Sequence, residues 1–278
     1  MAKIIDGKSL ATRIKAEIKA EIERDKLNVG LAVVIVGNDR ASEIYVKYKK
    51  DDCAECGIQS FEYALPEYVC LEDLLELIEE LNDDENINGI LVQQPLPRHI
   101  DAVTVNETIS PFKDVDAFRA DSLGKIALGD YDFSPCTPAG IMEMLHNENI
   151  SVSGKECVVI GRSAIVGKPM ALMLLHEDAT VTICHSKTRD LGEAARRADV
   201  LVAAAGCPGL VGADMVKEGA VVIDVGMNRD ESGKLCGDVK FAEVSGKASY
   251  ITPVPGGVGP MTRAMLMKNA LMAKRLQL

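Results

Sequence analysis

The sequence predicts an α/β protein with parallel sheets and two domains. Apolar stretches of strand length alternate with helical apolar patterns along almost the whole chain, and no internal repeat is present. A chain of 278 residues is long enough for two hydrophobic cores. Residues 111–138 interrupt the alternation, because they carry three prolines, an acidic KDVDAF stretch and little periodicity. We expect this segment to connect the two domains and to line a cleft between them.

The region before residue 111 follows the alternation closely. Asp6 is expected to cap a helix in which Leu10, Ile14, Ile18 and Ile22 form one apolar stripe. The elements expected next are a strand at 31–36, a helix at 43–56, a strand at 58–65, a helix at 71–82 and a strand at 89–93. This order predicts a parallel α/β domain.

The region after residue 138 also alternates strands with helices, and it contains more strands. The expected elements are a helix at 139–146, strands at 157–160, 179–184, 199–206, 220–226 and 250–254, helices after Pro169 and at 213–218, a turn at 230–233, a loop at 253–260 and a last helix at 261–276. Strands this apolar are typical of a parallel sheet that is covered on both faces.

Composition and charge exclude several classes of protein. The net charge of −11 argues against a nucleic-acid or anionic membrane surface as the main partner. No apolar run reaches the length of a membrane span, and the first residues are too charged for a signal peptide. Of the eight cysteines, only Cys53 and Cys56 form a C-x-x-C, without a second pair at zinc spacing. We therefore expect a reduced, cytoplasmic protein without a bound metal.

A glycine-containing loop gives the clearest ligand signal. Residues 157–160 form an apolar strand that runs directly into a loop at 161–167, and a helical pattern follows. This strand–loop–helix–strand unit places backbone N–H groups at a helix N-terminus, where a phosphate group binds well. The spacing is not G-x-G-x-x-G, so glycines that only permit a tight turn remain an alternative.

The end of the next strand indicates which dinucleotide would bind. NAD sites usually carry a carboxylate there, which holds the ribose hydroxyls of the adenosine. Here the strand ends in His185-Ser186-Lys187-Thr188, and Arg162 lies in the glycine loop. Hydroxyl and cationic groups at this place favour the additional 2′-phosphate of NADP.

A second group of polar residues lies in the first region. Tyr45 and Lys49 share one face of an expected helix, and Gln93 lies at the carboxyl end of an expected strand. Asp114 and Asp116 lie in the connecting segment. Each of these residues also has an ordinary explanation. Lys49 would be a solvated lysine and Tyr45 a half-buried tyrosine. Gln93 would be a turn amide, and Asp114 and Asp116 would lie in a surface turn.

Taken together, the motifs are far more specific than any one of them. In chain order they are S-x-x-Y-x-x-x-K (42–49), VQQPLP (92–97), KDVD (113–116), PCTPAGI (135–141), GRSAIVGKP (161–169), CHSKT (184–188) and ITPVPGGVGPMT (251–262). This series resembles the bifunctional methylenetetrahydrofolate dehydrogenase/methenyltetrahydrofolate cyclohydrolase family over essentially the whole chain.

The resemblance implies a two-domain enzyme of one-carbon metabolism. Such an enzyme oxidises 5,10-methylenetetrahydrofolate with NADP and then hydrolyses the methenyl product to 10-formyltetrahydrofolate. The implied folate-binding catalytic domain comprises residues 1–138 together with the last helix, 261–278, and the implied Rossmann-like NADP-binding domain comprises residues 139–260. The resemblance also implies a homodimer that is joined through the nucleotide domains.

The resemblance further implies roles for individual residues. Lys49 would be the main catalytic residue, with Tyr45 against the folate, Gln93 orienting Lys49, and Asp116 holding the amino edge of the pterin. The implied substrate-binding residues are Tyr45, Lys49, Val92, Gln93, Asp116, Pro255, Gly256, Gly257, Val258 and Gly259. The implied cofactor-binding residues are Thr137, Gly161, Arg162, Ser163, Val166, Gly167, Ser186 and Met227.

Three positions depart from the pattern of the family. Ala117 follows Asp116 where the family usually has glycine, and an alanine would be strained if that position requires a positive φ. Gln94 replaces a leucine and Ser122 replaces an asparagine. Two other functions remain open: an NADP-dependent dehydrogenase that lacks the hydrolytic step, and a folate- or nucleotide-binding protein without activity.

Overall fold

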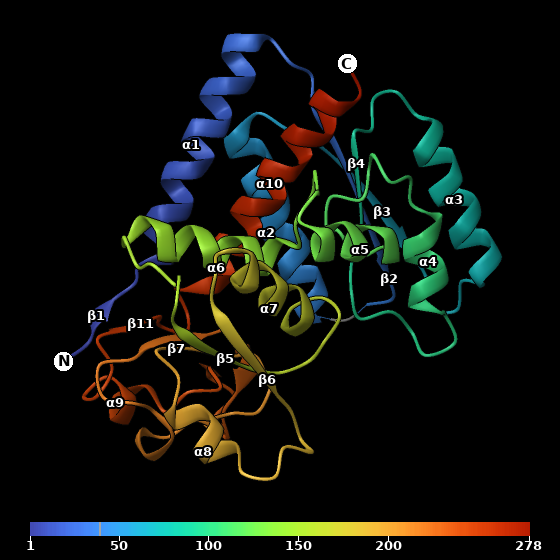
Figure 1. Ribbon diagram of the computed structural model, residues 1–278. Coiled ribbons are helices and arrows are strands. Elements are labelled where there is room, and N and C mark those ends of the chain that lie inside the picture. The colour runs from blue at the N-terminus through green and yellow to red at the C-terminus, as the bar shows by residue number, and fades with distance from the viewer. Residues whose placement is uncertain (39) are drawn as a thin grey trace. The chain divides into compact units, whose positions relative to one another are not determined.

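The computed structural model describes residues 1–38 and 40–278, and the side chains of residues 40–45 lie outside the description. The strands are β1 (Lys3–Ile4), β2 (Gly30–Val36), β3 (Gln59–Leu65), β4 (Gly89–Val92), β5 (Glu156–Ile160), β6 (Thr180–Cys184), β7 (Val200–Ala203), β8 (Val221–Asp224), β9 (Asn228–Arg229), β10 (Leu235–Cys236) and β11 (Tyr250–Ile251) (Figure 1). The helices are α1 (Gly7–Asp25), α2 (Arg40–Cys56), α3 (Leu71–Asp83), α4 (Ala102–Thr108), α5 (Ala120–Leu128), α6 (Cys136–Asn147), α7 (Gly167–His176), α8 (Leu191–Arg196), the 3₁₀ helix η1 (Ala213–Met215), α9 (Phe241–Val244) and α10 (Val258–Leu276).

The chain divides into two compact units. Unit 1 contains Met1–Ala11 and Thr137–Thr262, and unit 2 contains Thr12–Cys136 and Arg263–Leu278. The first residues group with unit 1 because β1 pairs in parallel with β11, with Lys3 opposite Tyr250. This division by compactness differs from the domains expected from the sequence, because residues 1–11 group with unit 1 and not with the rest of residues 1–138.

Unit 1 is built on a six-stranded sheet with the order β1-β11-β8-β7-β5-β6. All of its neighbouring strands pair in parallel, as the alternation of strands and helices predicts. Two of its central strands, β7 and β8, are buried along their whole length. Because β6 and β7 lie on opposite sides of β5, the strand order reverses there, and such a switch point is where open α/β sheets bind ligands.

Unit 2 contains a three-stranded parallel sheet with the order β3-β2-β4. Its core combines alternate residues of β2, such as Ala32 and Val34, with Leu74 and Ile78 of α3. The helix α1 begins after Asp6, whose Oδ1 accepts a hydrogen bond from the backbone N–H of Ser9, so the expected cap is confirmed.

Several short elements were not predicted. The helices α4, α5, α8 and α9 are each between four and nine residues long, which is too short for a repeated apolar pattern. Of these, α5 lies inside the expected connecting segment and ends at Gly129, which adopts the left-handed conformation with φ of 77°. The last helix begins at Val258 instead of Met261, so the end of the expected loop belongs to its first turn.

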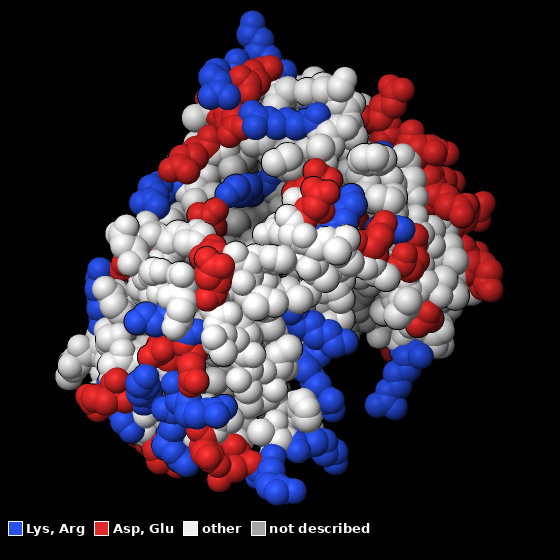
Figure 2. All heavy atoms as spheres, viewed as in Figure 1, with Lys and Arg blue, Asp and Glu red and all other residues white. Residues whose placement is uncertain are grey.

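Acidic side chains dominate the outward face of α3, as Figure 2 shows. The exposed members are Glu72, Asp73, Glu76, Glu79, Glu80 and Asp83. The opposite face of α3 buries Leu74, Ile78 and Leu81, which explains the clear amphipathic pattern. None of the helices in the described part of the chain is both long and apolar enough to cross a membrane.

Candidate functional site

In unit 2, the structure places Lys49 against Gln93. Lys49 lies on α2, and Gln93 directly follows β4 at the carboxyl edge of the three-stranded sheet. The Nζ of Lys49 donates a hydrogen bond to the Oε1 of Gln93 at 2.8 Å. The Nε2 of Gln93 donates to the backbone oxygen of Gln94 at 2.6 Å, so both ends of the amide are engaged. The backbone N–H of Gln93 also donates to the oxygen of Val34 of β2, which holds the residue at the sheet edge.

Asp116 belongs to the electrostatic environment of Lys49. Burial lowers the pKa of Lys49, and the nearby charge of Asp116 opposes this shift. Conversely, burial raises the pKa of Asp116, and Lys49 opposes that shift. The Sγ of Cys136 lies 3.4 Å from the Oδ1 of Asp116, and burial raises the pKa of this thiol well above its usual value. Cys136 is therefore a protonated thiol that donates to the carboxyl group of Asp116.

The loop that carries Asp116 is organised by its neighbour Asp114. Asp114 is buried and accepts hydrogen bonds from the backbone N–H groups of Phe118 and Arg119 at 3.2 and 3.1 Å, and from the Oγ of Ser122 at 2.9 Å. Ser122 thus stabilises the loop although it departs from the asparagine of the family pattern. Ala117, at the turn of this loop, has a φ of 54° and is 3% exposed. An alanine is therefore held in the conformation that favours glycine.

Two other side chains fix the ends of this segment. Lys113 is buried, and its Nζ donates to the backbone oxygens of Leu81 and Asp84 at the C-terminus of α3. The Nδ2 of Asn269 on α10 donates to the backbone oxygens of Val115 and Ser134 at 2.7 and 2.9 Å. Neither was given a role from the sequence, although Lys113 opens the KDVD motif, because a lysine and an asparagine inside polar or helical stretches give no signal of burial.

Gln94 is the third departure from the family pattern, and Tyr45 is the residue expected against the folate. The Nε2 of Gln94 is buried and has no hydrogen-bond partner among the described residues. Such an atom typically costs about 1–3 kcal/mol, so this replacement of leucine is unfavourable for stability. The side chain of Tyr45 lies outside the described residues, although Tyr45 itself is part of α2, one turn before Lys49.

In unit 1, the loop after β5 requires its glycines for steric reasons. Gly161 has a φ of 133°, and a Cβ there would lie 2.2 Å from the oxygen of Ala204. A Cβ at Gly167, the first residue of α7, would lie 2.3 Å from the oxygen of Gly161. The Oγ of Ser163 accepts from the N–H groups of Val166 and Gly167 at 3.2 and 3.3 Å, so it satisfies two backbone donors at the start of the helix.

The residues expected to select NADP lie on adjacent strand ends. Ile160 of β5 is in register with Cys184 of β6, and the N–H of Gly161 donates to the oxygen of Cys184 at 2.9 Å. Arg162 therefore lies two residues after Ile160, and Ser186 lies two residues after Cys184. Both side chains are exposed, as is that of Lys187. A guanidinium, a hydroxyl and an ammonium group are thus exposed at this edge.

The remaining expected cofactor residues also lie in unit 1. The hydroxyls of Thr137 and Thr262 are 2.9 Å apart. Met227, just after β8, is exposed, and its Sδ lies 4.0 Å from the position of a Cβ at Gly259. The expected substrate loop from Pro255 to Gly259 thus lies close to the expected cofactor residue Met227. Its Gly256 also accepts a hydrogen bond from the N–H of Lys8 at 3.0 Å.

Two buried carboxylates at the same sheet edge were not predicted. Asp224 ends β8, and Asp238 follows β10. The available signal was a carboxylate at the end of the apolar run 220–226, a place where ligands of parallel sheets bind. Among residues 1–38 and 40–278, no group of His, Cys, Asp and Glu is arranged to hold a metal ion.

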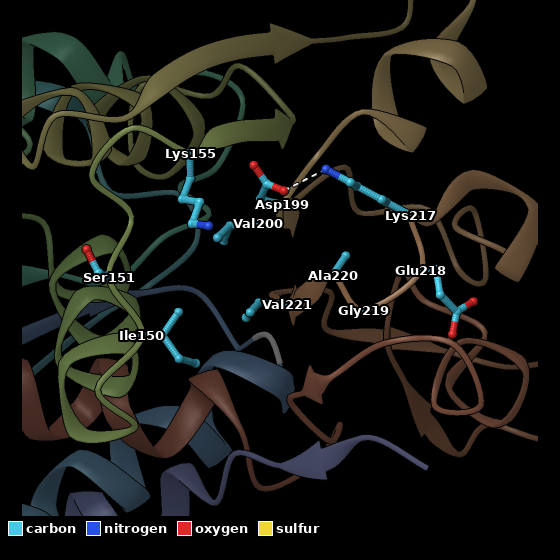
Figure 3. A pocket seen from close by; sticks show the side chains of 10 residues that line it. All are labelled: Ile150, Ser151, Lys155, Asp199, Val200, Lys217, Glu218, Gly219, Ala220 and Val221. Atoms are coloured by element: carbon cyan, nitrogen blue, oxygen red, sulfur yellow. Dashed lines mark hydrogen bonds and ion pairs between the residues drawn. The ribbon is translucent and has the colours of Figure 1, made fainter.

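The sheets carry hollows at opposite edges. A hollow of about 330 Å³ in unit 2 is lined by Val36, Gly37, Asn38, Glu67, Pro95, Leu96 and Pro97. These residues follow the carboxyl ends of β2, β3 and β4, next to Gln93. A smaller hollow of about 150 Å³ in unit 1 lies at the amino ends of β5, β7 and β8, where the Nζ of Lys217 contacts Asp199 at 2.7 Å (Figure 3). Because parallel sheets bind ligands at their carboxyl ends, the first hollow is the better candidate for a substrate.

Comparisons with known proteins agree with the resemblance in the sequence. Residues 5–116 match the family model described as the tetrahydrofolate dehydrogenase/cyclohydrolase catalytic domain. Residues 135–278 match the model described as the NAD(P)-binding domain of the same family.

Individual relatives match over their whole length. The bifunctional protein FolD of Acetivibrio thermocellus is 56% identical and covers 99% of this chain and 98% of its own. The crystal structure of the bifunctional FolD dehydrogenase/cyclohydrolase from Campylobacter jejuni is 49% identical, with a TM-score of 0.97 and 100% of both chains covered. The FolD structure from Trypanosoma brucei, complexed with NADP cofactor and inhibitor, is 40% identical, with a TM-score of 0.95 and 99% of this chain and 98% of its own covered. The chain belongs to the tetrahydrofolate dehydrogenase/cyclohydrolase family.

Proposed function

We propose that the protein oxidises 5,10-methylenetetrahydrofolate with NADP to 5,10-methenyltetrahydrofolate and hydrolyses this product to 10-formyltetrahydrofolate. The observation that carries the proposal is the hydrogen bond between Lys49 and Gln93, with Asp116 beside them. Family membership and full-length relatives named bifunctional FolD support it. The catalytic domain is assigned to residues 1–138 with 261–278, and the cofactor domain to residues 139–260.

Asp116 recognises the pterin in this proposal. A carboxylate accepts two hydrogen bonds from the adjacent donors of an amino-pyrimidine edge. Asp116 is held in place by the thiol of Cys136, and the loop before it is fixed by Lys113 and Asp114. The folate then occupies the carboxyl edge of the three-stranded sheet, where Val92 and Gln93 lie, with Tyr45 against it.

The glycine loop of unit 1 fits a dinucleotide. A Cβ at Gly161 or Gly167 would collide with neighbouring backbone, so the tight turn between β5 and α7 requires glycine at both positions. Glycines have the same role in the loops that bind the pyrophosphate of dinucleotides. The bound NADP would supply the hydride acceptor. The protein's own contribution to this step is positioning: Gly161, Arg162, Ser163, Val166, Gly167, Ser186, Thr137 and Met227 orient the cofactor, and residues 255–259 position the folate.

Lys49 performs the proton chemistry of the hydrolytic step. Because burial lowers its pKa, the amine is available in its neutral form at a lower pH than an exposed lysine. A neutral amine that donates to Gln93 keeps its lone pair for a water molecule. When this water attacks the methenyl carbon, Lys49 accepts one proton. As the bond from this carbon to N5 breaks, Lys49 passes its proton to N5, and the remaining proton of the hydroxyl group is released when the formyl C=O forms.

NADP preference rests on three exposed groups. Arg162, Ser186 and Lys187 lie at the ends of β5 and β6, where a carboxylate would repel the 2′-phosphate. A guanidinium group binds phosphate with two parallel hydrogen bonds, so Arg162 is the main candidate for this contact.

The protein is further proposed to act as a homodimer in the cytoplasm. β6 is an edge strand of the six-stranded sheet, and its Ile183 is 40% exposed. Leu175 on the preceding helix α7 is 55% exposed. Exposed apolar groups at an unpaired strand edge are typical of an interface with a second copy.

The test uses purified protein, methylenetetrahydrofolate and NADP, with NADPH and methenyltetrahydrofolate followed in the same cuvette. We expect NADPH to form while methenyltetrahydrofolate remains at a low level and 10-formyltetrahydrofolate accumulates. Methenyltetrahydrofolate that decays only at its rate in buffer would indicate a dehydrogenase without the hydrolytic step. Absence of NADPH would contradict the proposal and favour a binding protein.

A further inference from the structure

Unit 1 buries two carboxylates close to each other. Asp224 is 3% exposed and Asp238 is 0% exposed. A carboxylate in such surroundings is unfavourable unless hydrogen bonds replace the water that it loses. The contacts of this pair therefore show which parts of the chain depend on it.

Asp238 binds the loop that follows β7. Its Oδ2 accepts from the N–H groups of Ala205 and Gly206 at 2.6 and 3.0 Å, and its Oδ1 accepts from the N–H of Cys207 at 2.9 Å. The same Oδ1 accepts from the Nδ2 of Asn228 at 2.7 Å. One side chain thus fixes three successive backbone N–H groups and also residue 228, which follows β8.

Asp224 binds the loop that follows β8 and the segment that carries Asp238. Its Oδ1 accepts from the N–H groups of Gly226 and Asp238, each at 2.9 Å, and its Oδ2 accepts from the N–H of Val239 at 3.0 Å. A Cβ at Gly237 would lie 1.8 Å from the Oδ2 of Asp224. The glycine is required because the carboxylate lies directly against the backbone.

These loops form one side of the switch point. The N–H of Ala204 donates to the oxygen of Ile160, and the oxygen of Ala204 lies against Gly161 of the glycine loop. A dinucleotide binds across such a point with one half on each side. The side of β5 and β6 carries the glycine loop and Arg162, so it suits the adenosine half. The ends of β7 and β8 then face the nicotinamide half.

We propose that Asp224 and Asp238 are positioning residues of the dehydrogenase step, which hold residues 205–207 and 226–228 in the geometry that the nicotinamide half of NADP requires. This inference rests on the proposed function. Lys49, Gln93 and Asp116 belong to unit 2. Loss of the carboxylate pair should therefore weaken the dehydrogenase step selectively, whereas a pair that only stabilises the fold would affect both activities.

The test compares Asp238→Asn with Asn228→Ala and with a control, Asp230→Asn. Asp238→Asn replaces an acceptor oxygen by an N–H₂ group that opposes backbone donors. Asn228→Ala removes only the partly buried amide that donates to Asp238. This milder variant tests the inference if Asp238→Asn does not fold. Asp230 is an exposed turn carboxylate whose Oδ1 accepts from the N–H groups of Ser232 and Lys234 at 2.9 Å, so its variant makes the same chemical change outside the site.

For each variant, kcat and KM for NADP, the cyclohydrolase rate and the melting temperature are measured. In Asp238→Asn we expect kcat/KM for NADP to fall about tenfold or more, while the cyclohydrolase rate stays within about twofold. In Asn228→Ala we expect a loss of about threefold or more in the same parameter. Asp230→Asn should change neither activity.

Unchanged kcat/KM for NADP in Asn228→Ala, or equal losses of both activities in folded Asp238→Asn, would overturn the inference. A wild-type protein without NADP-dependent oxidation would instead overturn the proposed function. The two failures are therefore distinguishable.

Discussion

Lys49 and Gln93 are separated by 44 positions in the sequence, yet the Nζ of Lys49 lies 2.8 Å from the Oε1 of Gln93. The amide nitrogen of Gln93 donates to the backbone oxygen of Gln94, so the orientation of the amide is fixed by contacts at both ends. The oxygen that faces Lys49 is uncharged, and it accepts a hydrogen bond without favouring the protonated amine as strongly as a carboxylate would.

Gln93→Glu tests this arrangement through pH. Burial lowers the pKa of Lys49, and the charge of Asp116 opposes the shift, whereas the charge of Arg263 adds to it. Because the neutral amine is the active form, wild-type hydrolysis should rise with pH through a pKa below the ordinary 10.5. A carboxylate at residue 93 favours the ammonium form and moves this rise to higher pH.

We expect the Gln93→Glu cyclohydrolase rate to fall about 10²-fold or more near neutral pH and to recover partly at higher pH. Gln59→Glu, at an exposed position of β3, is the matched control and should keep the wild-type profile. A profile in Gln93→Glu that is lowered equally at every pH would contradict the assignment of the titrating group to Lys49.

Asp116→Ala tests the binding of the pterin. Removing the carboxylate leaves donors of the substrate without their acceptor, which typically costs about 1–3 kcal/mol of binding free energy. Both activities should weaken through a higher KM for folate, and the affinity for NADP should stay unchanged. Asp132→Ala, an exposed carboxylate of the same unit, provides the control. Normal folate affinity in Asp116→Ala would mean that the residue only shapes its loop.

Arg162→Ala tests the selection of NADP. The guanidinium group is exposed beside the end of β6, so its removal should raise KM for NADP much more than KM for NAD. Loss of one charge-assisted contact with the 2′-phosphate should raise the ratio of KM for NADP to KM for NAD by a factor of about ten or more. Arg13→Ala, an exposed arginine on α1, should leave both constants unchanged. Equal changes for the two cofactors would remove Arg162 from the phosphate site.

Ala117→Gly tests the strain in the loop after Asp116. A non-glycine residue with φ of 54° costs roughly 1–2 kcal/mol, and the greater freedom of glycine in the unfolded chain offsets part of the gain. We expect a net stabilisation of about 0.5–1 kcal/mol in chemical unfolding. Gly129→Ala, at a φ of 77° at the end of α5, should show the opposite sign. A less stable Ala117→Gly would mean that the buried methyl group outweighs the backbone strain.

The sequence was sufficient for the α/β class and the parallel sheets, because apolar runs such as 31–36 and 157–160 report burial directly. It also identified Lys49 and Gln93, which the structure joins by a hydrogen bond. The pairing of β1 with β11 was missed, since a strand of two residues carries no pattern.

The buried polar side chains were missed for a different reason. Asp238, Lys113 and Asn269 are satisfied by backbone groups that are distant in sequence, and these partners exist only after folding. From the sequence, strain at Ala117 follows only if the position requires a positive φ, and the structure shows a φ of 54° there.

In the proposed mechanism Lys49 carries the proton chemistry of the second reaction, whereas the first depends mainly on alignment. Lys49→Gln separates these two roles, because this change removes the amine and retains a polar side chain of similar length. The measurement is the ratio of the cyclohydrolase to the dehydrogenase rate in one progress curve that records NADPH and methenyltetrahydrofolate together. We predict that methenyltetrahydrofolate accumulates and that the ratio falls by about 10²-fold or more. Two rates that fall by the same factor would contradict the claim, because Lys49 would then only position the substrate.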